Sequence, residues 1–235
     1  MKKIGVIVFI FCAVVGLCFA NFFSFGHISD RLFNVKLDFG SSRVSGSGNI
    51  TTQQREVSGF SSVEVSGIFQ VQIVSGKELA IEVQADDNII PLVNTEVSGG
   101  TLHIGLERKV TTKNDMIVRI SVPNIEKVSS SGASTVNVSN IKNDSFAIDI
   151  SGASKVTLAG ETAHLNIDVS GAGNIDAEQL NAVRADVDAS GACKVAVNVS
   201  SELHSDASGA SFITYKGDPK IVDNHQSGVG SITKK

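Results

Sequence analysis

A repeated motif dominates the second half of the chain. Each of its six copies starts with Ser-Gly, followed five times by Ala and once by Val, and the copies begin at Ser131, Ser151, Ser170, Ser190, Ser208 and Ser227. Successive copies are 20, 19, 20, 18 and 19 residues apart. A fixed period near twenty residues indicates stacked units that bury a core only by packing on their neighbours. The repeat therefore predicts a solenoid.

The residues between the copies have the pattern of β-strands. Segments 166–170 and 185–189 alternate polar and apolar residues, and no segment after Asn124 has a helical period. Proline is absent between Asn124 and Asp218, as expected where backbone N–H groups join a ladder. The small residues of the motif let identical turns stack about 4.8 Å apart. We therefore predict an all-β protein in which residues 124–235 form a parallel β-helix with coils of about 19 residues.

The preceding part of the chain predicts a larger and less regular β region over residues 57–123. Strand patterns occur at 60–74, 79–84, 101–106 and 116–122. We expect this region to form the first coils and to cap the end of the solenoid, because an exposed terminal edge recruits other chains. Residues 21–56 are rich in Gly, Ser and Phe and are interpreted as a linker or a poorly ordered arm.

The first twenty residues have the pattern of a secretory signal peptide. Lys2 and Lys3 precede an apolar run from Ile4 to Ala20, and cleavage is expected after Ala20. An uncleaved anchor is the alternative, because the run is nearly long enough to span a bilayer. Membrane contact is expected only through such an uncleaved N-terminus. Both readings predict an extracytoplasmic protein, in the periplasm, on the cell surface or secreted.

Composition narrows the partners and the chemistry. After export Cys193 is the one remaining cysteine, so no intrachain disulfide is expected. The net charge of −4 provides no basic footprint, and nucleic acid is not an expected partner. Tryptophan is absent, Tyr215 is the single tyrosine, and Phe146 is the only aromatic residue between Asn124 and Ser211, so small aliphatic side chains must form a thin core there.

An ordered set of features resembles the GIN-domain family, whose members are described as head domains of autotransporter adhesins in bacterial envelope proteins. The features lie within residues 56–231 and are Phe60-Ser-Ser-Val-Glu-Val-Ser-Gly67, Asp86-Asp87-Asn88, Thr95-Glu96-Val97 with Leu102-His103-Ile104, Val122-Pro123-Asn124 and the repeated Ser-Gly-Ala. The resemblance implies a β-helical protein that is secreted or bound to the envelope. It implies no particular substrate.

An acidic column recurs two residues before the motif serine. Its members are Asp149, Asp168, Asp188 and Asp206, followed by His225 in the last copy. Alternation places this position outward, where carboxylates about 4.8 Å apart repel one another. Either solvent and salt screen the column, or it binds calcium through several carboxylate oxygens. Lys155 and Lys194, four residues after their serines, are expected to neutralise it in part.

A second group of polar residues occurs in the last two copies. His204 and Asp223 lie four residues before the equivalent serine position and, with Asp206 and His225, form a two-by-two patch on adjacent coils. Alternating His and Asp could hold a transition metal such as zinc. Charge compensation between surface neighbours explains the same pattern, and both readings stay open. No other cofactor is expected.

Motifs for catalysis are missing from the sequence. It contains neither a Gly-x-Ser-x-Gly elbow nor a His-Glu-x-x-His signature, and Cys193 is interpreted as a packed corner residue. We predict an adhesin-like envelope or cell-surface module, binding or structural, that has no catalytic residues and contacts glycan, protein or another copy of itself. The alternative is a carbohydrate-active enzyme, a polysaccharide lyase or hydrolase, because two aspartates of the column could act as an acid–base pair.

Overall fold

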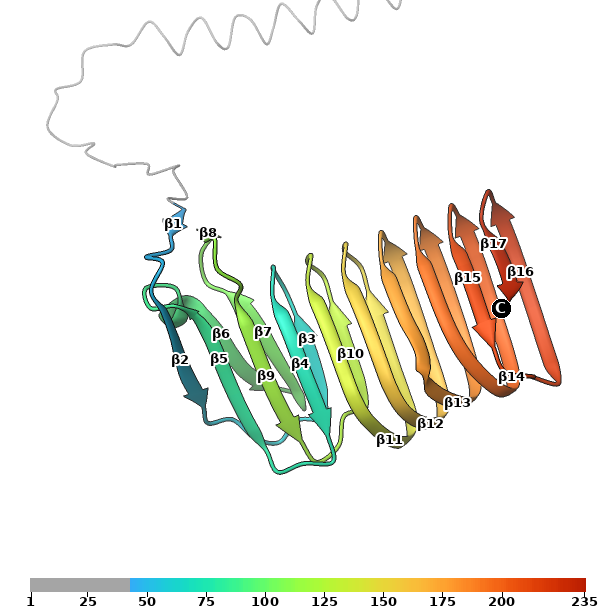
Figure 1. Ribbon diagram of the computed structural model, residues 1–235, viewed down its shortest axis with the longest axis horizontal. Coiled ribbons are helices and arrows are strands. Elements are labelled where there is room, and N and C mark those ends of the chain that lie inside the picture. Colours follow the sequence, from blue (N-terminus) through green and yellow to red (C-terminus); the bar gives the residue numbers. More distant parts are fainter. Residues whose placement is uncertain (1–42) are drawn as a thin grey trace, which may run out of the picture. The chain divides into compact units, whose positions relative to one another are not determined.

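The computed structural model describes residues 43–235. The predicted signal peptide and residues 21–42 of the predicted arm lie outside the described residues. Within the described part, two sheets of mostly parallel strands face each other, and the chain winds from one to the other (Figure 1). No helix of this part could cross a membrane, and its only helix is the short 3-10 turn η1 (Ile90–Leu92).

Sheet 1 contains, in spatial order, β2 (Ile50–Arg55), β5 (Ala80–Asp86), β9 (Ile117–Val122), β4 (Gln70–Ser75), the first halves of β11 (Thr135–Ile150), β12 (Lys155–Gly171), β13 (Asn174–Gly191) and β14 (Lys194–Gly209), then β15 (Phe212–Lys216) and β17 (Ser231–Lys234).

Sheet 2 contains β6 (Val93–Ser98), β7 (Thr101–Leu106), β3 (Ser62–Val65), β10 (Lys127–Ser130), the second halves of β11 to β14, and β16 (Ile221–Gly228). β11 to β14 belong to both sheets because each continues around a bend. The short β1 (Val44–Ser45) pairs separately with β8 (Val110–Thr111).

The predicted parallel β-helix is confirmed by the pairing register. Val136 pairs with Val156, Val156 with Ile175, and Ile175 with Val195, so each residue meets its counterpart one motif spacing away. All four side chains are buried between the sheets. The period of the sequence is therefore the length of one coil.

The motif glycines let neighbouring corners approach each other. A Cβ atom on Gly152 would lie 2.1 Å from the carbonyl oxygen of Gly132, which is closer than real Cβ contacts allow. The same carbonyl accepts a hydrogen bond of 2.9 Å from the N–H of Ala153. Since the φ of Gly152 is not positive, the close approach of the backbone requires glycine here, rather than an unusual conformation.

The core becomes thinner and more polar toward the last coil. One inward position of sheet 2 changes from Ile148 and Ile167 to Val187, Ser205 and finally Asn224. The first four side chains are buried, whereas Asn224 is exposed and accepts a 2.6 Å hydrogen bond from the Ser205 hydroxyl. Polar side chains thus end the apolar core, as terminal units of repeat proteins require.

The first coils do not follow the order of the sequence. β3 and β4 form a coil that lies between the later coil of β7 and β9 and the still later coil of β10 and β11 (Figure 1). Antiparallel strands flank this stack: β6 pairs with β7, and β5 pairs with β9. Parallel coils therefore give way to antiparallel pairs at the N-terminal end.

The interpretation of residues 21–56 as an arm is wrong for the two strands that the structure places there. β2 pairs antiparallel with β5, with Ile50 opposite Asp86 and Arg55 opposite Ile81. Five of the six residues of β2 are exposed, so the strand has no apolar alternation. It is held in place by its backbone pairing with β5. Arg55 also donates hydrogen bonds to the carbonyl oxygens of Ile90 and Val93, at 2.9 and 3.3 Å.

Candidate functional site

The acidic column forms one straight row on the outer face of sheet 2. Asp149 pairs with Asp168, Asp168 with Asp188, Asp188 with Asp206, and Asp206 with His225. All five side chains are exposed. Partial burial and then the neighbouring carboxylates of Asp206 and Asp168 raise the pKa of Asp188. The repulsion expected from the sequence therefore acts on Asp188, which lies between two other members of the row.

The expected neutralisation of this row by Lys155 and Lys194 is wrong. Both lysines lie on sheet 1, because the Ser-Gly corner separates them from the aspartates of sheet 2. Lys127, one coil below Asp149 and two positions along the strand, contacts it instead, with 3.6 Å between Nζ and Oδ2. Both lysines do follow their serines by four residues. The corner that lies between them and the aspartates turns the chain onto the other sheet.

The His and Asp patch is part of a longer chain of alternating charges. His204 contacts Asp223 at 3.8 Å, and His225 contacts the same carboxyl group at 3.7 Å. His204 also contacts Glu202 at 2.8 Å, and Glu202 contacts Arg184 at 3.4 Å. These contacts support charge compensation between surface neighbours.

The chain of charges ends one coil further on. Arg184 contacts Asp186 at 3.2 Å, and Asp186 contacts His164 at 2.5 Å. Partial burial alone would raise the pKa of Asp186, but the hydrogen bonds from Arg184 and His164 outweigh it and lower this pKa. The ionic groups from His164 to Glu202 therefore pair with one another, whereas the aspartates of the row do not take part.

The calcium and zinc readings stay predictions. Within residues 43–235, no three His, Cys, Asp or Glu side chains lie close enough together to hold a metal ion. The carboxylates of the row point outward from a flat sheet. A metal site would need side chains of adjacent coils to converge.

The outer face of sheet 1 has a different character. Its two central rows contain charged residues such as Lys155 and Asp176, and between them six uncharged amide and hydroxyl side chains, namely Gln70, Gln72, Thr135, Asn137, Thr157 and Asn174. All six are at least partly exposed. Across the residues that the structure describes, none of these six side chains makes a hydrogen bond to another protein group. These rows of sheet 1 therefore offer free uncharged donors and acceptors. On sheet 2, the charged groups from His164 to His225 are paired, and the aspartate row beside them is acidic.

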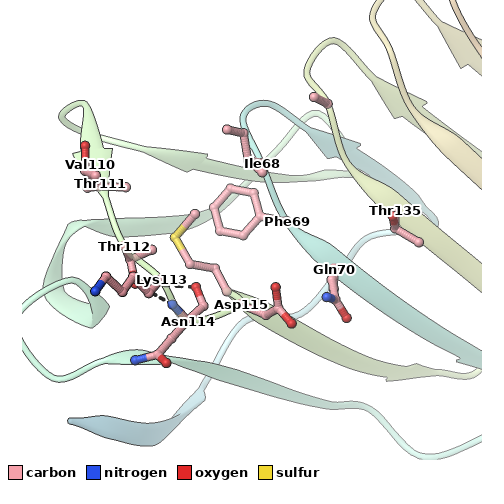
Figure 2. Close-up of a pocket in the computed structure, with 12 residues that line it drawn as sticks. Ile68, Phe69, Gln70, Val110, Thr111, Thr112, Lys113, Asn114, Asp115 and Thr135 are labelled. Carbon is pink, nitrogen blue, oxygen red and sulfur yellow. Dashed lines mark hydrogen bonds between the residues drawn. The ribbon is translucent and has the colours of Figure 1, made fainter. Parts of the chain in front are cut away.

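A cleft of about 440 Å³ lies at the N-terminal end of this face. Figure 2 shows Ile68, Phe69 and Gln70 from the β3–β4 corner on one side and residues 110–115 on the other. Phe69 and Met116 are buried at its base, whereas 69% of the surface of Ile68 is exposed. The cleft therefore joins an apolar rim to the polar rows.

Sequence reasoning did not single out this cleft, although a signal was present. Residues 66–68 read Ser-Gly-Ile, so a large apolar residue occupies the corner position that Ala fills in the regular copies. Ala133 stands next to it in the following coil and also lines the cleft. A departure from the repeat thus marked the site.

A buried carboxylate positions the wall of the cleft. Asp86 is 1% exposed and accepts hydrogen bonds from Thr112 Oγ1 at 2.5 Å, Asn114 Nδ2 at 2.6 Å and the N–H of Gly48 at 3.1 Å. The bonds from Thr112 and Asn114 lower the pKa of Asp86. The first residue of the Asp86-Asp87-Asn88 motif therefore ties the end of β5 to two loops.

The other two residues of the motif hold the N-terminal turn. Asp87 accepts a hydrogen bond from the Ser47 hydroxyl, and Asn88 accepts one of 2.9 Å from the Ser47 N–H. Asn88 also donates to the carbonyl oxygen of Ser45 at 2.8 Å. The motif is a structural support of the cleft and supplies no lining residue.

Fold and surfaces together define a β-solenoid module with two flat, chemically different faces and a cleft at one end. Residues 59–219 match the family described as "Putative auto-transporter adhesin, head GIN domain", and the chain belongs to this family. The predicted resemblance is confirmed. No curated protein matches the chain.

Several solved structures have the same fold. A "putative adhesin" from Bacteroides fragilis NCTC 9343 is 21% identical, with a TM-score of 0.67 over 82% of this chain and 100% of that chain. A "putative adhesin" from Parabacteroides distasonis ATCC 8503 is 19% identical, with a TM-score of 0.53 over 82% and 100%. A "putative lipid binding protein" from the same organism is 19% identical, with a TM-score of 0.50 over 82% and 99%. At these identities the likeness concerns the fold.

Proposed function

We propose that the protein is an adhesin-like binding module, exported to the cell envelope or surface, that binds glycan on the outer face of sheet 1 and catalyses no reaction. The observation that carries this proposal is the difference in side-chain pairing between the two faces. Family membership supports the adhesin-like class. The two faces support the choice of surface.

The free groups of sheet 1 suit sugar hydroxyls. An amide such as that of Gln72 or Asn137 can donate and accept at once, as a hydroxyl ligand requires. Each row presents an outward side chain every 4.8 Å or so along the stack, so that an extended polymer meets donors and acceptors at a regular spacing. On sheet 2 a ligand would first have to break the contacts among Arg184, Asp186 and Glu202. The hydrogen bonds that a ligand formed there would be offset by the ion pairs that it broke.

The described residues give little support to the alternative of a carbohydrate-active enzyme. Cys193 is 1% exposed, and its Sγ lies 3.5 Å from the carbonyl oxygen of Gly171, so it packs inside a corner. The aspartates of the row stand on an open face, where water surrounds the groups that would have to transfer protons. The cleft itself contains Asp115 as its one carboxylate among its lining residues.

The test compares two asparagines on opposite faces. Asn137 on sheet 1 and Asn166 on sheet 2 are both exposed and outward. We expect Asn137→Ala to weaken binding to immobilised neutral polysaccharides, such as a mannan, a xylan and a β-glucan, by about three- to tenfold. Asn166→Ala should leave it unchanged. Circular dichroism checks that both variants fold.

The same polysaccharides, assayed for new reducing ends and unsaturated products, test the absence of catalysis. Product release by the wild type that Asp168→Asn abolishes would overturn the proposal in favour of an enzyme. Equal loss in both asparagine variants would place the ligand elsewhere. Binding to a protein partner or to a second copy, with no polysaccharide retained, would also overturn it.

A further inference from the structure

A second hollow lies on the outer face of sheet 1, toward its C-terminal end. Its volume is about 580 Å³, and lysines surround it. Ala196 forms the floor, because it stands in one outward row between Asp176 and Thr214, whose side chains are longer. Ala196 is only 8% exposed although it points outward. A single small residue thus creates a depression in an otherwise flat face.

Two lysines beside the hollow have no acidic partner among residues 43–235. Lys155, Asn174 and Lys194 are register partners on three successive coils, and all three are exposed. The two lysines are therefore about 9.6 Å apart at the backbone, with one coil between them. Long side chains let both ammonium groups reach one ligand in the hollow.

The hollow has two acidic groups, of which one is ion-paired. Glu178 accepts hydrogen bonds from Lys216 and, at 2.7 Å, from Lys235, and these bonds lower the pKa of Glu178. Asp176 accepts a 3.1 Å hydrogen bond from the N–H of Glu178. This N–H is neutral, so Asp176 keeps its negative charge. The lining nevertheless has four lysines, at 155, 194, 234 and 235, against two carboxylates, and the hollow is therefore positive in a chain whose net charge is −4.

An aromatic side chain continues the lysine row. Phe212 is the register partner of Lys194 on the next coil, and 48% of its surface is exposed. An exposed aromatic ring next to cations and amides suits the apolar face of a sugar ring that carries an acidic group. A bilayer surface would call for a larger apolar face, whereas the rest of this row and the floor are Lys, Asn and Ala.

We propose that this hollow, named the lysine hollow, binds the carboxylate or sulfate groups of an acidic polysaccharide between Lys155 and Lys194, with Phe212 against a sugar ring. The inference rests on the proposed glycan-binding function of sheet 1 and names the class of glycan. The acidic row of sheet 2 lies around the corner and repels the same polymer. The ligand is therefore held on one face only.

The experiment measures binding of polygalacturonate and of its methyl ester, which has the same sugar without the charge. The full chain is compared with Lys155→Gln/Lys194→Gln. A matched control, Lys142→Gln/Lys220→Gln, removes two exposed lysines outside the hollow and gives the same net charge. We expect the first pair to lose about tenfold or more in affinity for polygalacturonate at low salt, with the control within about twofold of wild type.

The outcomes separate this inference from the proposed function. Equal losses in both lysine pairs would reduce the effect to net charge and overturn the inference. Wild-type binding to neutral polysaccharides that depends on Asn137, with none to polygalacturonate, would overturn the inference and leave the proposed function standing. Failure to bind any polymer would overturn both. Retention of phosphatidylserine vesicles without retention of polygalacturonate would assign the lysine hollow to a membrane surface instead.

Discussion

The regular coils of residues 127–234 and the N-terminal region of residues 44–122 share one pair of sheets but differ at their corners. In the regular coils, glycines stack on glycines, and the chain returns to the same position after each turn. In the N-terminal region the corner carries Ile68, antiparallel strands flank the coils, and a buried Asp86 holds the loops. Repetition gives extended rows of like groups, whereas its interruption gives a cleft.

The largest effect on stability is expected from a substitution that disrupts a corner of the regular coils. Gly152→Ala places a Cβ atom 2.1 Å from a neighbouring carbonyl oxygen, so that two coils must move apart. We expect the free energy of unfolding to fall by roughly 3 kcal/mol, at the upper end for an overpacked site. Urea denaturation measures the change.

The control lies in the N-terminal region. Gly99, in the turn between β6 and β7, has a φ of 57° and nothing within 4 Å of a Cβ atom. Gly99→Ala should cost only the strain of a left-handed conformation, about 1–2 kcal/mol. A loss in Gly99→Ala equal to that in Gly152→Ala would show that corner stacking does not distinguish the two regions.

A smaller effect is expected from the support of the cleft. Asp86→Ala removes the acceptor of three hydrogen bonds and leaves Thr112 and Asn114 without their partner. The melting temperature should fall by several degrees, and proteases should cut within residues 110–116 more readily. Asp87→Ala, at the exposed neighbour that bonds Ser47, should change both much less.

The pH dependence of this effect follows from the direction of the pKa. Asp86 has a lowered pKa in the folded state, so its stabilisation is present above its ordinary value of 3.8 and is lost as the pH falls below it. The gap in melting temperature between wild type and Asp86→Ala should therefore narrow on acidification. A gap that stays constant from pH 7 to pH 3 would contradict an ionised Asp86.

The smallest expected effects concern two aspartates of sheet 2, two residues apart. Asp186 has a lowered pKa, so its ionised form stabilises the fold above pH 3.8, and Asp186→Asn should lower the melting temperature by about 1–3 °C at pH 7.

Asp188 has a raised pKa, so its ionised form costs stability above that pKa. Asp188→Asn should raise the melting temperature by about 1 °C, and acidification should remove this gain.

The effects of sodium chloride and calcium chloride on the melting temperature distinguish screening of the acidic row from calcium binding. If solvent screens the acidic row, sodium chloride and calcium chloride at matched ionic strength should stabilise the wild type equally. Both should also reduce the advantage of Asp188→Asn. A rise specific to calcium that disappears in Asp168→Asn/Asp188→Asn would instead establish a calcium site on the row.

The sequence was most informative where units repeat. The spacing of the Ser-Gly motif predicted the coil length, the register and the row from Asp149 to Asp206, because each follows from counting along identical units. Counting failed for Lys155 and Lys194, since a corner lies between them and the aspartates. It could not reveal β2, whose strand depends on backbone pairing with β5 and leaves no apolar pattern. The cleft also escaped prediction, because the residues at Ile68 and 110–116 approach each other only through the stacking of β4 on β9.

The displaced coil of β3 and β4 has a consequence for how the molecule folds. Gln70 pairs with Thr135, which is 65 residues later, whereas Thr135 pairs with Lys155 only 20 residues further on. Closing the longer loop costs more chain entropy, and contacts between distant residues form slowly. The regular coils can grow one at a time from local contacts. The coil of residues 62–75, although earlier in the chain, is therefore expected to complete its contacts last.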